Sequence, residues 1–227
     1  IIHWLHTRDN FKVKNKAVVG VTQRVDKIDI YGEWRDALDQ RLVDWVVEAG
    51  FILVAIPNAL VDVSLSNDSQ PNLDIWLNTI NIDALLLSGG NDIGSVPQRD
   101  VTERYLLRWA EKNSKPVLGI CRGMQMIGTY SGVELIHVDG HVNTRHQLNI
   151  NYDYGQSLPK SVNSYHNLVL QECPTQFEVL ATSEDGNIEA IMHRELSWQG
   201  WMWHPEREEK FSINDLDRFK KLIINGK

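Results

Sequence analysis

The sequence predicts an α/β fold in which a mostly parallel central sheet is flanked by helices and continues into a partly antiparallel C-terminal flank. In the first half of the chain, short apolar segments rich in β-branched residues alternate with segments of helical periodicity. This alternation is typical of a parallel sheet that is covered on both faces. In the second half, short strand-like segments follow one another, and Asp185-Gly186 marks a hairpin turn.

The first half is predicted to repeat a strand followed by a helix. Apolar side chains at helical spacing, such as Leu38, Leu42 and Trp45, identify the helices, and Gly50 is typical of a helix C-terminus. Pro71 is accepted in the first turn of a helix. We expect strands at residues 17–23, 51–57, 83–90 and 116–121, and helices at residues 33–50, 71–80, 100–113 and 122–132.

The second half is predicted to end in a helix that begins after Ser212, a residue type favoured as an N-cap. No linker or low-complexity tract interrupts the chain, so we predict a single domain over residues 1–227. The first 16 residues match no pattern that we recognise, and we expect them to be disordered or added to the natural chain. We expect strands at residues 134–138, 146–152, 161–170 and 197–203, a hairpin over 177–193, and the terminal helix over 212–225.

Composition restricts the classes of partner. The chain carries 30 acidic and 23 basic residues, a formal charge of −7, which disfavours a surface for nucleic acid or for an anionic membrane. Because it has neither an apolar run of about 18 residues nor a signal-peptide pattern, we expect a cytoplasmic protein that binds small molecules. Cys121 and Cys173 are expected to be free thiols in that reducing compartment. A homodimer is compatible with the sequence.

The segment Gly119-Ile120-Cys121-Arg122-Gly123 places a cysteine between a buried strand and a helix. This context is typical of a nucleophile elbow, in which glycines permit a sharp turn. The N-terminus of the helix favours a thiolate, and the backbone N–H of Arg122 is a candidate donor to an oxyanion. On its own, the motif is equally consistent with a buried structural cysteine.

Two further segments also follow predicted strands. The carboxyl ends of parallel strands lie at one edge of the sheet, so we expect these segments to lie near Cys121. Gly89-Gly90 ends the preceding strand and offers the N–H of Gly90 as a second oxyanion donor, although a simple turn also explains these glycines. His204 follows the last strand, and Glu206 lies beyond a proline that stiffens the connection. Taken alone this segment is a surface turn, but together with Cys121 it supplies a nucleophile, a base and an orienting acid.

In this order, the motifs resemble the class I glutamine amidotransferase-like family, and specifically its γ-glutamyl hydrolase branch, peptidase C26. The resemblance covers nearly the whole chain from Ala17 and rests on residues 88–92, 119–125 and 204–206. It implies a flavodoxin-like fold, a γ-glutamyl thioester on the cysteine, proton transfer by the histidine, and release of L-glutamate by water. Arginine directly after the nucleophile is more similar to the stand-alone hydrolases than to glutaminases linked to a synthetase. The resemblance implies no cofactor.

The resemblance also implies which residues hold the glutamyl group. These are Gln125 in the elbow helix, Asn91 after the glycine pair, and Tyr165, His166 and Asn167 in the segment before the C-terminal strands. For the histidine of that segment, an ordinary structural role in a strand is the alternative.

His137, His141 and His146 lie close together in the sequence. Their spacing matches no pair of zinc ligands on a helix, and no set of carboxylates lies beside them, so we expect no metal. The loop that carries them, together with Arg145, is instead expected to cover the active site and to contact the leaving group.

Within the branch, the motifs are most similar to hydrolases that release L-glutamate from a γ-glutamyl-linked cytidine diphosphoramidate, for the phosphoramidate modification of capsular polysaccharide. A diphosphate requires positive charge, for which Arg122, Arg145 and Arg207 are candidates. A solvated surface position is the alternative for Arg207. Three other functions stay open: a hydrolase of the γ-glutamyl-aminobutyrate type, a glutaminase subunit that delivers ammonia to a synthase, and a binding module without catalysis.

Overall fold

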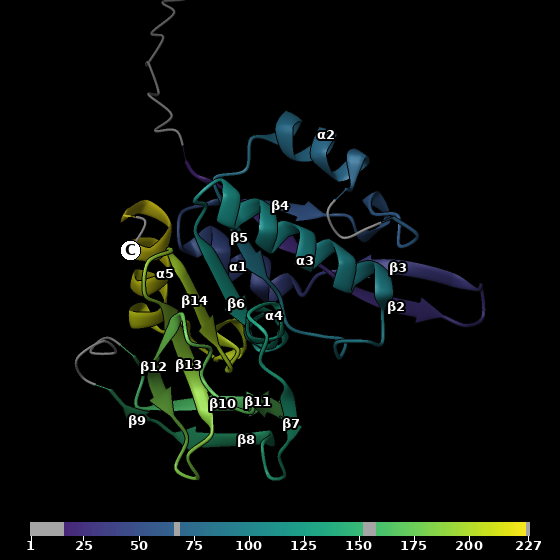
Figure 1. Ribbon diagram of the computed structural model, residues 1–227. Helices are drawn as coiled ribbons and strands as arrows, with labels where there is room; N and C mark the ends of the chain where they lie inside the picture. Colours follow the sequence, from purple (N-terminus) through teal and green to yellow (C-terminus); the bar gives the residue numbers. More distant parts are fainter. Residues whose placement is uncertain (1–15, 66–68, 152–157, 226–227) are drawn as a thin grey trace, which may run out of the picture.

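The computed structural model describes residues 16–65, 69–151 and 158–225. Its centre is an eight-stranded sheet in the order β4-β1-β5-β6-β14-β13-β12-β9 (Figure 1). The first five strands of this order are parallel to one another, and the last three are antiparallel to their neighbours. In sheet order the strands are β4 (Ile52–Ile56), β1 (Val18–Thr22), β5 (Ala84–Leu87), β6 (Val117–Ile120), β14 (Trp198–Trp201), β13 (Ile188–His193), β12 (Phe177–Thr182) and β9 (Asn149–Ile150).

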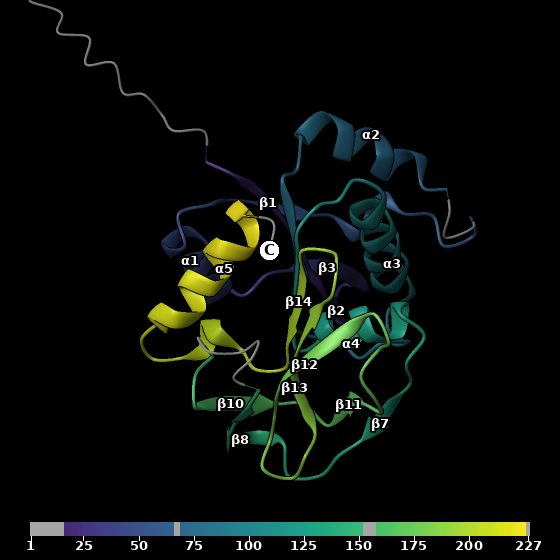
Figure 2. The ribbon, with the colours of Figure 1, turned by 60° about the vertical axis from the view of Figure 1, so that its left-hand side comes forward.

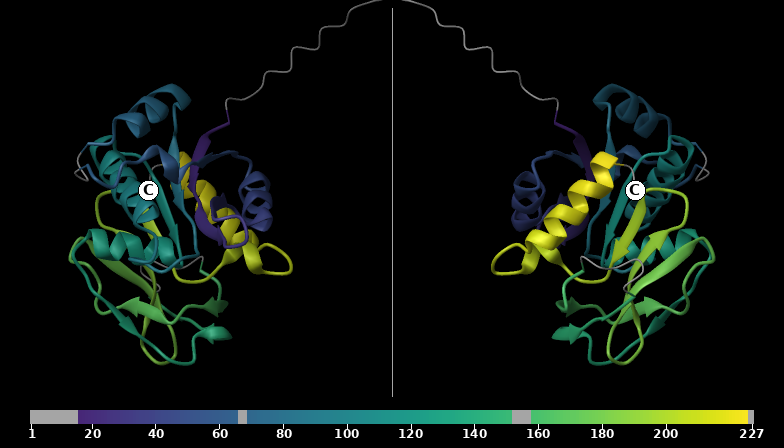
Figure 3. Two further views of the ribbon diagram at one scale, coloured as in Figure 1. Left: turned by 90° about the vertical axis from the view of Figure 1, so that its right-hand side faces the viewer. Right: turned by 90° about the vertical axis from the view of Figure 1, so that its left-hand side faces the viewer.

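Helices cover both faces of this sheet, as Figures 2 and 3 show. On one face lie α1 (Gln40–Glu48) and α5 (Ile213–Asn225), and on the other lie α2 (Pro71–Ile80), α3 (Pro97–Lys112) and α4 (Arg122–Tyr130). Because both faces are covered, strands such as β5 and β6 are buried along their whole length. The predicted fold class is therefore confirmed.

Large aromatic side chains fill the core between the sheet and the helices α1 and α5. The rings of Trp45 and Phe219 stack at 4.6 Å between centroids, and Trp201 stacks on Trp203 at 5.3 Å. Burying a side chain of this kind contributes about 1.5–3 kcal/mol to the free energy of folding. Ser212 accepts a hydrogen bond from the backbone N–H of Asp215, as expected at the start of α5.

Three two-stranded sheets complete the structure. They pair β2 (Arg24–Ile28) with β3 (Glu33–Ala37), β10 (Ser161–Tyr165) with β8 (Val142–Gln147), and β11 (Leu168–Leu170) with β7 (Leu135–His137). The last two pairs gather at one end of the molecule, beside β12 and β13 (Figures 1 and 2). Short 3-10 turns follow β4 and β14, at Asn58–Leu60 and Pro205–Arg207.

The helix expected over residues 33–50 is wrong in its first part. Residues Glu33–Ala37 form β3, in a hairpin whose register pairs Arg24 with Ala37. The helix begins only at Gln40, because the side chain of Asp39 accepts a hydrogen bond from the N–H of Arg41 and caps the first turn.

Smaller differences affect the second half. The strand expected over residues 161–170 is divided into β10 and β11, and the one expected over 146–152 is divided between β8 and β9, with residue 152 outside the described residues. Of the first 16 residues, only Lys16 lies within the described part, so the expectation for this segment falls outside the described residues. Both cysteines are free thiols, as predicted. Among the described residues, no helix has the length and apolar character needed to cross a membrane.

Candidate active site

Cys121 stands at a sharp turn between β6 and α4. Its backbone has a φ of 51° and a ψ of −105°, a conformation that is strained for any residue other than glycine. The turn depends on close backbone approach: a Cβ atom on Gly119 would lie 2.5 Å from the carbonyl carbon of Gly123. The N–H of Cys121 donates to the carbonyl of Trp201 in β14 at 2.7 Å, which fixes the elbow to the neighbouring strand.

His204 and Glu206 follow β14, the strand beside β6. Nδ1 of His204 lies 2.6 Å from Oε1 of Glu206, and both side chains are buried. Burial acts to lower the pKa of His204, but hydrogen bonds with Cys121 and Glu206 outweigh it and raise this pKa to about 9. The imidazole of His204 therefore lies between the thiol of Cys121 and the carboxylate of Glu206. The catalytic roles expected of these three residues stay a prediction.

Two side chains that we did not identify from the sequence hold the segment that carries this histidine. Asn163 in β10 clamps the backbone of His204: its Oδ1 accepts from the N–H at 2.9 Å, and its Nδ2 donates to the carbonyl at 2.8 Å. Arg41 in α1 donates to the carbonyls of Glu206 and Glu208 at 2.8 and 2.5 Å. Asn163 belongs to the segment that the sequence analysis selected for substrate binding, so its proximity to the site could have been predicted. Arg41 lies on an amphipathic helix, and no sequence pattern indicated that it reaches the site.

The loop after β5 lies against the same histidine. A Cβ atom on Gly89 would be 2.5 Å from Cε1 of His204, so only glycine allows this contact. Arg99 in α3 donates to the carbonyls of Ser88 and Gly89 at 2.7 and 3.0 Å. Because C=O and N–H point in opposite directions in a trans peptide, the N–H of Gly90 points away from that guanidinium.

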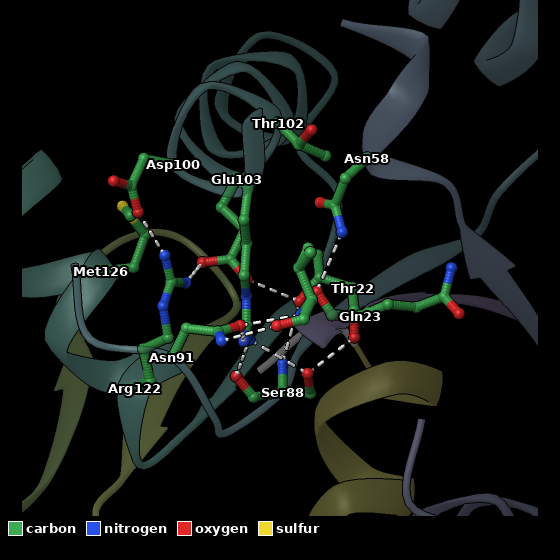
Figure 4. A network of polar contacts seen from close by, with 12 residues as sticks. Thr22, Gln23, Asn58, Ser88, Asn91, Asp100, Thr102, Glu103, Arg122 and Met126 are labelled. Atoms are coloured by element: carbon green, nitrogen blue, oxygen red, sulfur yellow. Dashed lines mark hydrogen bonds and ion pairs between the residues drawn. The ribbon is translucent and has the colours of Figure 1, made fainter. Parts of the chain in front are cut away.

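A buried ion network supports this loop from α3 and α4 (Figure 4). Glu103 accepts hydrogen bonds from Thr22 at 2.8 Å, from Arg99 at 3.1 Å, and from Arg122. Arg122 also contacts Asp100 at 2.5 Å. The Arg122 side chain is therefore engaged by two carboxylates of α3, in contrast to the expectation that it could meet a diphosphate.

The other two candidate arginines have different surroundings. Arg145 is exposed and pairs with Glu208 at 3.0 Å. Arg207 lies 4.7 Å from the centroid of the Tyr165 ring and lines a small cavity of about 30 Å³, which Gly89, His204 and Arg24 also line. The arginines Arg24 and Arg207 thus border the cavity next to the imidazole, together with the carboxylates of Asp39 and Glu206.

The residues expected to hold the glutamyl group are only partly brought together. The ring of Tyr165 meets the imidazole of His204 edge to face, at 5.8 Å between centroids. Gln125 on α4 donates to the carbonyl of Leu168 at 2.9 Å, and the amide of Asn91 bonds to both the N–H and the carbonyl of Val25 at 2.8 Å.

His166 and Asn167 differ from Tyr165 in their surroundings. His166 is buried, 5.0 Å from the ring of His141 and 3.5 Å from the carboxylate of Glu189. Asn167 is exposed, and its carbonyl accepts a hydrogen bond from Val138. Substrate contacts by these two residues stay a prediction.

A larger cavity of about 510 Å³ is bordered by Val25, Trp34, Asp36, Asn58 and the start of α3. It contains none of the three residues Cys121, His204 and Glu206. On the β2–β3 hairpin, the residues that line this larger cavity alternate along the strands with Arg24 and Ala37, which line the small cavity. Because successive side chains of a strand point to opposite faces, the two cavities lie on opposite faces of the hairpin.

The comparisons with known proteins agree with this fold. A solved structure from Thermoplasma acidophilum, assigned to one of the subunits of GMP synthase, superposes with a TM-score of 0.66 over 92% of both chains at 21% identity. The chain is 28% identical to γ-glutamyl-CDP-amidate hydrolase of Campylobacter jejuni over 214 residues, and this alignment covers 89% of this chain and 96% of that protein. It is 25% identical to γ-glutamyl-γ-aminobutyrate hydrolase of Escherichia coli O157:H7, over 86% of this chain and 87% of that one.

The fold is that of the class I glutamine amidotransferases. Within that class, the sequence model of peptidase C26 matches residues 17–206, and the chain belongs to the peptidase C26 family. The family and its γ-glutamyl hydrolase members support an enzyme that hydrolyses γ-glutamyl amides.

Proposed function

We propose that the protein hydrolyses γ-glutamyl amides with Cys121 as nucleophile, His204 as acid and base, and Glu206 as the group that orients the imidazole. The observation that carries this proposal is the buried contact of His204 with both partners at the carboxyl ends of β6 and β14. A cysteine at a strained elbow, a histidine and an orienting carboxylate form the set required for covalent acyl transfer.

The reaction proceeds in two stages. Sγ of Cys121 attacks the γ-carbonyl carbon of the substrate, the C–N bond breaks, and His204 gives a proton to the leaving nitrogen. Water then attacks the thioester, His204 takes its proton, and L-glutamate leaves with the thiol restored.

Two backbone N–H groups are the proposed donors to the negative oxygen of the tetrahedral intermediates. Arg122 is the first residue of α4, so its N–H has no partner within the helix. The N–H of Gly90 points away from Arg99, and the adjacent Gly89 packs on the imidazole. Removal of one such donor typically lowers the rate about 100- to 1000-fold.

We propose γ-glutamyl-CDP-amidate as the substrate, and cytidine diphosphoramidate for capsular polysaccharide as the second product. The similarity to the Campylobacter hydrolase over nearly its full length supports this choice. Arg24 and Arg207, which border the small cavity beside His204 together with Asp39 and Glu206, are the candidate contacts for a diphosphate.

The test compares glutamate release from γ-glutamyl-CDP-amidate, γ-glutamyl-aminobutyrate and glutamine by the purified protein. We expect kcat/KM to be at least about 100-fold higher for the nucleotide, which corresponds to about 2.7 kcal/mol of transition-state preference. Preference for the simple amine would assign the protein to amine catabolism, and glutamine hydrolysis only with an added synthase would make it a glutaminase subunit.

Two cysteine variants test the nucleophile in the same assay. Cys121→Ala should release no glutamate from any of the three compounds, because it lacks the attacking atom. Cys173→Ala is the matched control and should keep the wild-type rate, since this partly buried thiol bonds only to the carbonyl of Pro174. Turnover by Cys121→Ala near the wild-type rate would refute the mechanism.

A further inference from the structure

Three histidines and a glutamate converge beside the small β8–β10 sheet. His146 lies in β8, His141 immediately precedes that strand, His166 immediately follows β10, and Glu189 lies in β13 of the central sheet. One potential ligand atom from each of the four residues lies within 4.8 Å of all the others. Figures 1 and 2 show the small sheet next to the end of β13, which brings these distant segments together.

Six polar atoms of this cluster lack a hydrogen-bond partner in the part of the chain that the structure describes. Nδ1 of His141, Nε2 of His146, both ring nitrogens of His166 and both carboxylate oxygens of Glu189 are buried without a hydrogen bond. Glu189 has no exposed surface at all. An isolated buried carboxylate costs several kcal/mol of folding free energy unless a cation compensates it. Glu189 therefore requires a positive charge beside it, either on a protonated imidazole of the cluster or on a bound cation.

The geometry fits a small tetrahedral cation. Oε1 of Glu189 lies 3.5 Å from Nε2 of His166 and 3.7 Å from Nδ1 of His141. Bonds of about 2.1 Å from a central zinc place neighbouring ligand atoms of a tetrahedron about 3.4 Å apart. The two measured separations are close to this value, so small side-chain movements suffice to close the site.

A second carboxylate orients one of the candidate ligands. Nε2 of His141 lies 2.8 Å from Oδ2 of Asp185, in the hairpin turn between β12 and β13. An ionised carboxylate only accepts hydrogen bonds, so Nε2 carries the proton and Nδ1 presents its lone pair to Glu189. Such a carboxylate behind a histidine ligand is typical of zinc sites. Glu189 and Asp185 together balance the two charges of Zn²⁺.

We propose that His141, His146, His166 and Glu189 bind a structural zinc ion. Four protein ligands fill a tetrahedral coordination sphere, and a closed site of this kind stabilises the fold instead of activating water. The spacing along the sequence argued against a metal because no two histidines share a helix; the ligands come instead from strands that only the fold unites. The ion ties the β8–β10 sheet to the central sheet, one residue from Tyr165.

Metal analysis of protein purified without metal-affinity chromatography tests the proposal. We expect about one zinc per chain, retained through dialysis against buffer. Removal by a strong chelator should lower the Tm, and added Zn²⁺, but not Mg²⁺, should restore it, because Mg²⁺ prefers six oxygen ligands. This result does not depend on which γ-glutamyl amide the enzyme cleaves.

Variants locate the site. His166→Asn and Glu189→Gln should each lose the bound zinc and the response of the Tm to the chelator. His137→Asn is the matched control, since this exposed histidine in β7 lies outside the cluster and should keep both properties. If the two cluster variants do not fold, the chelation of wild-type protein decides the question. Less than about 0.1 zinc per chain after incubation with excess Zn²⁺, or a Tm unchanged by chelation, would overturn the proposal.

Discussion

The proposed chemistry depends on the imidazole side chain of His204. It has no freedom to turn, because Asn163 holds its backbone from both sides and Gly89 packs on its ring. Burial alone would make a neutral imidazole, and the contacts with Cys121 and Glu206 reverse this and raise the pKa of His204 to about 9. At neutral pH the histidine is therefore charged in the folded protein.

This environment predicts a pH dependence. The pKa of an unfolded-state histidine is about 6.5, so the raised pKa of His204 stabilises the fold fully below about pH 6.5. The stabilisation is lost as the pH rises through about 9. Glu206→Gln removes one cause of the raised pKa of His204. The free energy of unfolding of this variant should therefore fall below that of the wild type, most at low pH and less as the pH approaches 9.

Activity should report the same group. The basic limb of kcat/KM against pH is expected near pH 9 in the wild type and at lower pH in Glu206→Gln, because the imidazolium is lost earlier. Glu209→Gln, at an exposed position three residues further on, is the control that should leave the limb in place. Superimposable limbs in wild type and Glu206→Gln would show that this carboxylate does not tune the histidine.

At the scale of elements, α3 acts as the support of the loop after β5. Arg99 and Glu103 are one helical turn apart on its buried face, and their contacts reach Ser88 and Gly89 in the loop and Arg122 in α4 (Figure 4). The network thus connects the two peptide segments that offer N–H groups to the proposed oxyanion.

The central carboxylate of this network predicts a large loss of stability on substitution. Glu103→Gln leaves Arg99 and Arg122 buried with much of their counter-charge removed, which should lower the free energy of unfolding by about 3–5 kcal/mol. Chemical denaturation measures this value. Glu48→Gln at an exposed position of α1 is the control, expected to change stability by less than about 0.5 kcal/mol. Equal effects of the two substitutions would contradict a supporting role for the network.

The elements also show what sequence patterns reveal and what they miss. Strands β5 and β6 were predictable because buried parallel strands are uniformly apolar, and the order of the motifs then indicated Cys121 and His204. The β2–β3 hairpin was missed because Trp34 and Leu38 fit the helical period of the following segment. The partners of Arg122 and His166 depend on contacts between distant segments, which no local pattern records.

At the scale of the whole molecule, sheet order explains how a site is assembled from distant segments. β5, β6 and β14 are consecutive in the sheet, so their carboxyl ends bring residues 88–90, Cys121 and His204 to one edge. The antiparallel strands β13 and β12 continue the sheet, and the small sheet beside them contributes Asn163 and Tyr165 from β10 to the same site. The cavity at this edge carries mixed charge, with Arg24 and Arg207 beside Asp39 and Glu206, in a chain whose formal charge is −7.

The central claim is that Cys121 carries the glutamyl group during turnover, and rapid acid quenching of the wild-type enzyme with excess γ-glutamyl substrate tests it most directly. Intact-mass and peptide mass spectrometry should find a glutamyl adduct on the peptide that contains Cys121, and none in the Cys121→Ala variant. An adduct on Cys173 or on another side chain, or multiple turnovers with no covalent intermediate at any quench time, would contradict the account.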